Sequence, residues 1–372
     1  MTDGMRTVAQ VWNNWKDAAR IGVYPFEHTK YEDHEKVLSG LSTFAREAWA
    51  QAYSVAAQPF EEAATAAERT GNFEVAKQNY LRASGLYRLA RWPACNSPGK
   101  KTAYAKSKET FLAAAKYFDI PVARVEMPFD GRPGEGRAVI GYFRRPSLPG
   151  KLPLVLGWGG LDYYKEDAAD LFAPFLSKGA ATLTIDIPGT ADAPILASPD
   201  AERMWDAVFA WIKSRADLDA SRVVGWGLST GGYWAAKVAH THAAHFRGVV
   251  NHGGCAHYTF QREWIEKAQS GYYPFELAET LASTLGLNTL EDWIANAPKL
   301  SLLTQGVLDR PCAPLLLING VADTVFNMED MQLLLQRGSP KTARFYPGEH
   351  MGITPETFPT IYEWVNERLA VS

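Results

Sequence analysis

Hydrophobic and polar positions follow different patterns in two parts of the chain. From about residue 7 to residue 117 the sequence is rich in Ala, Lys, Glu and Leu, without the alternating β-branched runs that are typical of strands. This pattern predicts helices. After Ile120-Pro121 the sequence changes to short β-rich segments separated by Gly and Pro. We therefore expect a helical N-terminal region at 1–120 and a second domain at 121–372.

Eight β-rich segments alternate with helical patterns in the second domain. The clearest helical patterns cover 200–215, 232–242, 328–337 and 356–369. Alternation of this kind predicts an α/β fold, with a mostly parallel sheet covered by helices on both faces. A helical, aromatic-rich stretch at 258–310 interrupts it, and we expect a cap-like insertion there. The β-rich segments are VARVEMPFDG, RAVIGYFRRP, KLPLVLGWGG, AATLTIDIPG, SRVVGWGLS, RGVVNHGG, PLLLING and ARFYPG.

One helical segment, AAERTGNFEVAKQNYLRASGLY, resembles a single tetratricopeptide-like unit. Its small and aromatic residues fit that helix-turn-helix packing at Ala67, Gly71, Ala76, Tyr80 and Ala83. Stable solenoids need about three or more repeats, so a helical subdomain is favoured over a repeat scaffold. A non-catalytic protein-binding module that uses these helices is the alternative from another functional class.

The segment SRVVGWGLSTGGYWAAKVAH contains the strongest chemical motif. A β-branched strand runs into Gly227-Leu228-Ser229-Thr230-Gly231, and a helix rich in small residues follows. This is the arrangement of a nucleophile elbow, in which a sharp turn holds a serine in a strained conformation and the flanking glycines avoid collisions with backbone. We therefore predict Ser229 as the nucleophile.

A serine hydroxyl needs a base, and after such an elbow the carboxylate and the histidine follow in that order along the chain. Asp323 comes just after the strand PLLLING, and His350 comes just after ARFYPG. We predict Asp323 as the acid that orients the base His350. Asp309 is the main rival for the acid, and Glu349 is a more distant one.

The remaining parts of the site are predicted from the turn GWGGLDYYKED and from nearby aromatic residues. We expect the oxyanion to be bound by the N–H of Thr230 and by that of Gly160 or Leu161. Tyr163, Tyr233 and Tyr258 are candidates to contact substrate, and core packing is the alternative for each.

Five further histidines have simpler expected roles. His240, His242 and His245 are expected to mark the solvated end of the helix after the elbow, whereas His252 and His257 could line the pocket. No Asp or Glu lies at a suitable ligand spacing, so we expect no metal site.

Composition excludes several classes of function. Apolar residues make up 47% of the chain and charged residues 21%, with a net charge of −3, so no basic surface for nucleic acid is indicated. The longest apolar runs are strand-sized, and a membrane helix needs roughly 20 residues. No targeting segment is visible at the start of the sequence, so cytoplasmic residence is expected. The three cysteines suggest neither disulfides nor a zinc site, and the sequence has no dinucleotide-binding GxGxxG.

Several motifs together resemble one α/β-hydrolase group. They are GWGGLDYYKED, DIPGT at 186–190 and GLSTGG around Ser229, together with Asp323 and His350. The group includes 2,6-dihydroxypseudooxynicotine hydrolase, fungal polyketide-shortening hydrolases and fermentation-respiration switch esterases. The resemblance implies an α/β-hydrolase fold behind a helical N-terminal region, no cofactor, and a homodimer acting on a small-molecule substrate.

The resemblance also implies the reaction. It favours hydrolysis of a carbon–carbon bond next to a ketone, in an aromatic or polyketide-like substrate, over hydrolysis of an ester. Asp162 matches the aspartate of the group's GGLD motif, and we expect it to structure the loop.

Overall fold

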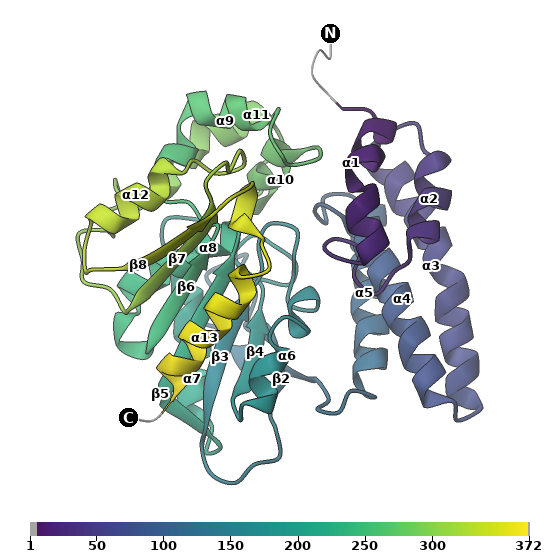
Figure 1. Ribbon diagram of the computed structural model, residues 1–372, viewed down its shortest axis with the longest axis horizontal. Helices are drawn as coiled ribbons and strands as arrows, with labels where there is room; N and C mark the ends of the chain where they lie inside the picture. The colour runs from purple at the N-terminus through teal and green to yellow at the C-terminus, as the bar shows by residue number, and fades with distance from the viewer. Residues whose placement is uncertain (1–5, 371–372) are drawn as a thin grey trace. The chain divides into compact units, whose positions relative to one another are not determined.

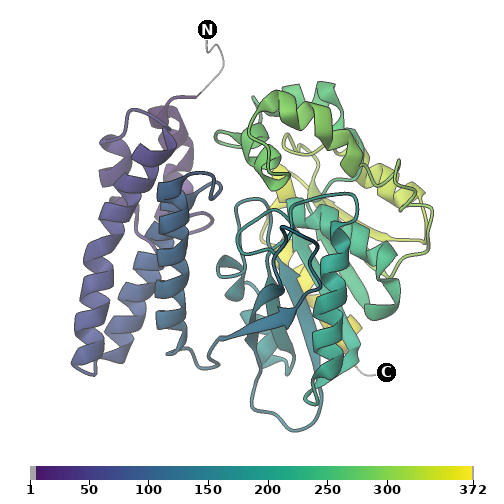
Figure 2. The same ribbon diagram turned by 180° about the vertical axis from the view of Figure 1, so that it is seen from behind.

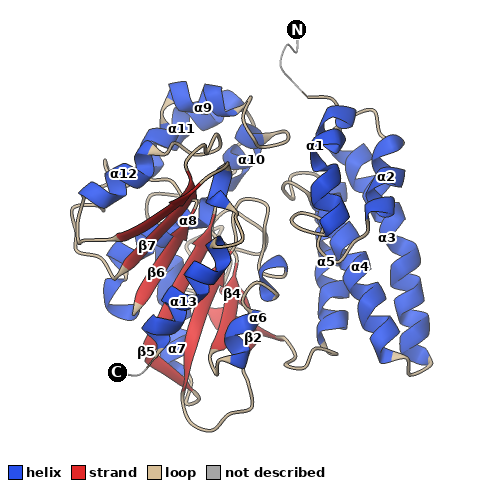
Figure 3. Cartoon of the chain, viewed as in Figure 1, coloured by secondary structure: helices blue, strands red, loops and turns tan. Residues whose placement is uncertain are grey.

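The computed structural model describes residues 6–370. The chain divides into two compact units, and the division falls between Val122 and Ala123. Within the described residues, the first unit contains helices only, and all the strands belong to the second unit (Figure 3). No helix within these residues is both long and apolar enough to cross a membrane.

From residue 6 onward, the first unit contains five α-helices whose ends follow local sequence signals. At the start of α1 the side chain of Thr7 accepts from the N–H of Gln10, and the Gln10 side chain accepts from the N–H of Thr7. Between α3 and α4 the chain turns at Gly71, where φ is +76°. The helices are α1 (Val8–Ile21), α2 (Tyr31–Ser39), α3 (Arg46–Arg69), α4 (Phe73–Arg91) and α5 (Pro98–Ala115).

The second unit is built on one eight-stranded sheet in the order β1-β2-β4-β3-β5-β6-β7-β8. Strand β2 is antiparallel to β1 and β4, and the other neighbours are parallel. This is the sheet of an α/β-hydrolase, and the predicted fold class is confirmed. The strands are β1 (Ala123–Pro128), β2 (Ala138–Arg144), β3 (Leu152–Trp158), β4 (Ala181–Ile185), β5 (Leu218–Leu228), β6 (Gly248–His252), β7 (Leu315–Gly320) and β8 (Thr342–Tyr346).

Helices cover both faces of this sheet because successive strand residues point to opposite faces. In β3, Leu154 and Leu156 belong to the core on one face, and Val155 belongs to the core on the other. Helices α6 (Ala173–Ser177) and α13 (Thr357–Leu369) cover the face of Val155, which is turned toward the viewer in Figure 1. Helices α7 (Met204–Ser214), α8 (Thr230–Thr241) and α12 (Glu329–Gln336) cover the opposite face, seen in Figure 2.

An insertion with three helices lies between β6 and β7, where the sequence predicts a cap-like segment. Its helices are α9 (Arg262–Ala268), α10 (Leu277–Thr284) and α11 (Leu290–Asn296), which group together above the sheet in Figure 1. The buried carboxylate of Asp330 in α12 holds the start of the insertion. It accepts from the N–H groups of His257 and Tyr258, both at 2.7 Å, and of Thr259 at 3.1 Å.

Candidate active site

Ser229 sits on a strained turn between β5 and α8. Its φ of 55° and ψ of −124° are unusual for a residue with a side chain. The turn is also tight. A Cβ added to Gly227 would lie 2.2 Å from the carbonyl oxygen of Gly231, and one added to Gly231 would lie 2.0 Å from that of Gly159. Glycine is therefore required at 227 and 231 if Ser229 is to keep this geometry.

The hydroxyl of Ser229 belongs to a hydrogen-bonded chain of three side chains. His350 Nε2 lies 2.8 Å from Ser229 Oγ, and His350 Nδ1 lies 2.8 Å from Asp323 Oδ2. His350 follows β8 and Asp323 follows β7, so adjacent parallel strands bring the two side chains to the same end of the sheet. Phe326 packs edge-on against the His350 ring, with 5.2 Å between ring centroids.

Asp323 is buried but fully hydrogen-bonded. Its Oδ1 accepts from the N–H groups of Val325 and Phe326, at 2.8 and 2.9 Å, and its Oδ2 also accepts from the Asn319 amide at 2.8 Å. Burial alone would raise the pKa of Asp323. The charge and hydrogen bond of His350, with the Phe326 N–H and the Asn319 amide, outweigh burial and lower that pKa. The carboxylate is therefore ionised and able to orient the imidazole.

Neither rival carboxylate is bonded to His350. Asp309 is exposed and lies 3.4 Å from Arg337. Glu349 Oε2 accepts from the N–H and hydroxyl of Thr324, at 3.2 and 2.9 Å. Of the three candidates, Asp323 is the one in contact with the imidazole.

Thr230 and Gly160, whose N–H groups are predicted to bind an oxyanion, both lie close to Ser229. Thr230 is the first residue of α8, where N–H groups have no partner inside the helix and the helix dipole is positive. Gly160 approaches closely, since an added Cβ would lie 2.9 Å from Ser229 Cβ and 3.4 Å from Ser229 Oγ. Leu161, the alternative to Gly160, has its side chain buried in the core.

A small cavity lies beside Thr230, which is one of its lining residues. Its volume is about 20 Å³, which is room for one water molecule. Tyr233 lines it, but Tyr163 and Tyr258 do not. The walls also come from α8, the insertion and Phe326, and the lining residues are Pro188, Ala197, Thr230, Tyr233, Trp234, Cys255, Phe260, Leu281, Thr284, Trp293, Leu300 and Phe326.

Residues of the GGLD turn make contacts that the sequence did not specify. The hydroxyl of Tyr163 donates to the carbonyl of Asp167 at 2.7 Å, and its ring packs against the core on the α6 and α13 face. Asp162 Oδ2 accepts a 2.6 Å hydrogen bond from Tyr273 of the insertion. This hydrogen bond links Asp162 to the insertion.

The expectation that the histidines after the elbow mark a solvated helix end is wrong for two of them. His240 and His242 are buried, and His245 is half-buried. His240 Nδ1 lies 2.8 Å from the carbonyl oxygen of Arg310, and burial lowers the pKa of His240 to about 4. The end of α8 is covered in this way because the helix is buried on nearly all sides, from Gly231 to His240.

The two histidines expected near the pocket do not line the cavity. His257 Nδ1 lies 2.7 Å from Ser301 Oγ. His252 is completely buried behind His350, and its Nε2 lies 2.8 Å from the carbonyl oxygen of Met351. Sequence reasoning also missed Asn319. This residue follows the apolar residues LLLI and precedes a glycine, and an Asn-Gly pair is typical of a turn rather than of a functional side chain. The signal that could have identified it is a polar residue at the end of a strand that is otherwise apolar and therefore buried.

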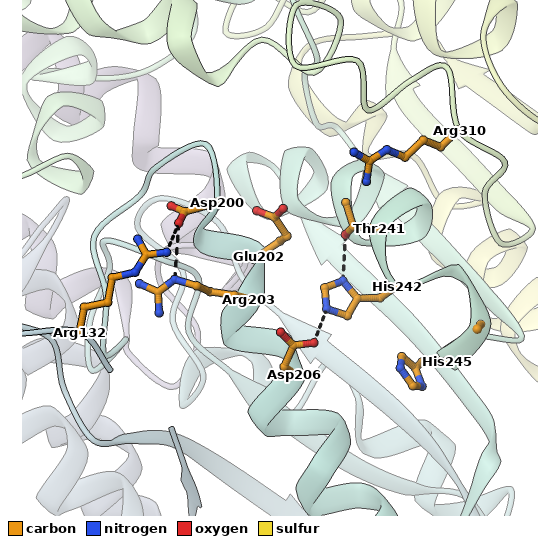
Figure 4. Close-up of a pocket in the computed structure, with 10 residues that line it drawn as sticks. Arg132, Asp200, Glu202, Arg203, Asp206, Thr241, His242, His245 and Arg310 are labelled. Atoms are coloured by element: carbon orange, nitrogen blue, oxygen red, sulfur yellow. Dashed lines mark hydrogen bonds and ion pairs between the residues drawn. The ribbon is translucent and has the colours of Figure 1, made fainter. Parts of the chain in front are cut away.

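A larger, open cleft of about 480 Å³ lies at the far end of α8 (Figure 4). There Thr241 Oγ1 lies 2.8 Å from His242 Nδ1, and His242 Nε2 lies 3.2 Å from Asp206 Oδ1. Three arginines also line it: Arg132, Arg203 and Arg310. Within residues 6–370, no three His, Cys, Asp or Glu side chains are grouped so that they could hold a metal ion.

Known proteins resemble the chain over most of its length. Residues 15–369 match a family described as FrsA-like, "Esterase FrsA-like". Esterase FrsA of Enterobacter sp. (strain 638) is 25% identical over 267 residues, which cover 70% of this chain and 63% of that protein. Hydrolase ORFZ of Pyricularia oryzae is 31% identical over 217 residues, covering 51% of this chain and 49% of that protein. The matches thus span less than two thirds of these curated relatives.

Solved structures resemble the fold more completely. The crystal structure of 2,6-dihydroxy-pseudo-oxynicotine hydrolase has a TM-score of 0.77 and 20% identity, and the match covers 96% of each chain. Wild-type AbyA5 has a TM-score of 0.72 and 19% identity, covering 96% of this chain and 92% of that one. These likenesses extend to the helical region as well as to the sheet.

Proposed function

The chain belongs to the FrsA-like esterase family of α/β-hydrolases, and from that membership we propose that it is a serine hydrolase with Ser229, His350 and Asp323 as its triad. The observation that carries the proposal is the pair of 2.8 Å contacts that link Ser229 Oγ through the imidazole to Asp323. The strained backbone of Ser229 and its place before a helix start support the same role.

In the proposed reaction Ser229 Oγ attacks a substrate carbonyl while His350 Nε2 takes the hydroxyl proton. Asp323 holds the imidazole in the required tautomer and stabilises its charged form. The N–H groups of Thr230 and Gly160 bind the oxyanion. His350 then gives the proton to the leaving group, and the same histidine activates a water that hydrolyses the acyl enzyme.

For the bond cleaved, we propose a carbon–carbon bond next to a ketone in an aromatic or polyketide-like substrate. A carbon leaving group must depart as a carbanion that is delocalised into a neighbouring carbonyl, and it then takes the proton from His350. The aromatic lining of the cavity, with Tyr233, Phe260 and Trp293 among its members, supports an aromatic substrate. At about 20 Å³ the cavity would have to open to admit one.

Ester hydrolysis is the second candidate, and the family's description as esterases favours it. The steps are the same except that the proton from His350 goes to an alkoxide or phenolate oxygen. This bond is the easier one to break, because oxygen carries the developing charge better than carbon.

The test compares wild-type protein with Ser229→Ala on aryl esters and on 1,3-diketones or acyl phenols, with product mass as the readout. Ser301→Ala is the matched control, because the buried Ser301 hydroxyl also lies 2.7 Å from a histidine but is not on an elbow. We expect fluorophosphonate labelling and turnover to be lost in Ser229→Ala and kept in Ser301→Ala.

The outcome separates the candidates. Faster cleavage of diketones than of esters supports carbon–carbon hydrolysis, and turnover of esters alone overturns it in favour of an esterase. If the wild-type protein turns over neither panel and Ser229 is not labelled, the hydrolase proposal is wrong. The non-catalytic binding module would then become the better account.

A further inference from the structure

Two buried polar side chains behind the triad hold the backbone of the residue that follows His350. Asn319 Oδ1 accepts from the N–H of Met351 at 2.9 Å. His252 Nε2 lies 2.8 Å from the carbonyl oxygen of Met351. Both side chains are at most 1% exposed. The two polar groups of this one residue are therefore fixed from different strands, β7 and β6.

The backbone at Met351 needs such support because it is strained. Its φ is 69°, in the left-handed region, which is energetically unfavourable for a residue with a side chain. The next residue, Gly352, also has a positive φ of 60°, and a Cβ added there would lie 2.7 Å from the Asn319 carbonyl. A loop without these contacts would relax and turn the His350 side chain away from its present position.

Asn319 also connects the base to the acid. Its Nδ2 donates to Asp323 Oδ2 at 2.8 Å, and this oxygen is the one bonded to His350 Nδ1. A side-chain amide suits this position because it carries both a donor and an acceptor, whereas an aspartate would offer no donor and a leucine neither. One side chain thus fixes the distance between the two loops that carry His350 and Asp323.

Burial favours the neutral imidazole of His252 in its contact with the Met351 carbonyl oxygen. A carbonyl oxygen only accepts, so His252 Nε2 must carry the proton in this contact. Burial lowers the pKa of His252 to about 4, and the charge of His350 acts in the same direction. His252 is therefore neutral near neutral pH, and it adds no positive charge behind the base.

We propose that Asn319 and His252 are positioning residues of the proposed hydrolase, which hold the strained Met351 backbone so that His350 stays between Asp323 and Ser229. The inference rests on the proposed function of the triad. It gives a role to two buried polar groups that neither touch the cavity nor belong to the hydrogen-bonded chain itself.

The test uses Asn319→Leu, His252→Leu and His252→Gln, with His240→Leu as the matched control. His240 is also buried, also bonds a backbone carbonyl through one ring nitrogen, and lies at the far end of α8. We expect Asn319→Leu to lower kcat on the order of 100-fold, with KM within about threefold. We expect His252→Leu to lower kcat roughly 10-fold and His252→Gln, which keeps a donor, to recover most of it.

Thermal unfolding and proton NMR separate positioning from general loss of stability. His240→Leu should lower Tm and leave kcat unchanged. In folded Asn319→Leu protein, the downfield proton resonance of the His350–Asp323 hydrogen bond should shift or broaden. If the Asn319 variant does not fold, the two His252 variants decide the question.

Two results would overturn the inference in distinguishable ways. Wild-type kcat in Asn319→Leu and His252→Leu, with only the Tm loss of the His240 variant, would mean that these residues stabilise without positioning. A wild-type protein that neither turns over esters or diketones nor labels with fluorophosphonate would overturn the proposed function, and the positioning role with it.

Discussion

Helix α8 has a hydroxyl–imidazole–carboxylate chain at each end, and the two chains differ in their surroundings. At its start Ser229, His350 and Asp323 are linked by contacts of 2.8 and 2.8 Å. At its end Thr241, His242 and Asp206 are linked by contacts of 2.8 and 3.2 Å (Figure 4). The second chain lines the larger space, a cleft of about 480 Å³, whereas the cavity of about 20 Å³ lies beside Thr230 at the helix start.

Electrostatics and backbone geometry favour the first chain for chemistry. The helix start presents N–H groups and a positive dipole to an oxyanion, whereas the helix end presents carbonyl groups and a negative one. The Asp323 side chain is fully buried, but that of Asp206 is 73% exposed and only weakly fixes its histidine. Thr241 also donates to the Lys237 carbonyl, at 3.1 Å, within the same helix. A hydroxyl, an imidazole and a carboxylate in contact are thus not sufficient to indicate a nucleophilic site without the turn that precedes the helix.

The largest expected difference between the ends comes from replacing each carboxylate by an amide. Asp323→Asn should lower kcat on the order of 10⁴-fold, because an amide no longer holds His350 in the tautomer that accepts the serine proton. Asp206→Asn should change kcat by less than about twofold, as a surface change does. Initial rates on an aryl ester measure both. Equal losses in the two variants would contradict the distinction between the ends.

A smaller difference is expected from adding one methyl group at each end. An added Cβ at Gly160 would lie 3.0 Å from the Leu228 carbonyl oxygen and would push the turn away from Ser229, so Gly160→Ala should lower kcat/KM roughly 10- to 100-fold. An added Cβ at Gly338 would lie 2.9 Å from His240 Cε1, at a φ of +65°. Gly338→Ala should therefore cost about 1–3 kcal/mol of stability.

The two glycine variants control for each other, because one is expected to lose activity and the other stability. Gly338→Ala should leave kcat/KM near the wild-type value in the folded protein. A large loss of kcat/KM in Gly338→Ala would mean that the far end of α8 takes part in turnover.

The smallest difference concerns the pH dependence of stability. Burial lowers the pKa of His252, near the start of α8, and of His240, near its end, to about 4 in each case. The unfolded chain has a histidine pKa near 6.5 and so binds more protons between pH 6.5 and pH 4. The free energy of unfolding should have its full value above pH 6.5. It should decrease as the pH falls toward 4, by on the order of 3 kcal/mol for each histidine.

Denaturant unfolding at several pH values measures this slope. His240→Gln and His252→Gln should each reduce it by about one proton. Of the leucine variants at the same two positions, only His252→Leu should also lower kcat. An unchanged slope in both would show that neither histidine is neutral and buried in solution.

The sheet and the candidate triad could be predicted because each rests on a local signal. Short β-rich segments bounded by Gly and Pro predicted all eight strands, and the glycines around Ser229 indicated its turn. The order of acid and base along the chain then selected Asp323 and His350.

Features that depend on distant segments could not be predicted in this way. Burial of His240 depends on a loop 70 residues away that supplies the Arg310 carbonyl. Asn319 precedes a glycine and therefore has the pattern of a turn residue, although its side chain is bonded to Asp323 and to the N–H of Met351. Tyr163 lies in the correct loop, but its ring packs on the other core, because loop residues have no period that assigns a face.

The carboxylate of Asp330 attaches the start of the insertion through backbone groups rather than through side chains. It comes from a helix that follows the insertion in the chain, yet it holds the backbone of residues 257–259 through N–H groups, which almost any residue provides. Side chains between that anchor and β7 can therefore change without loss of the attachment. Substitutions of side chains within α9–α11 therefore leave this backbone anchor at residues 257–259 in place.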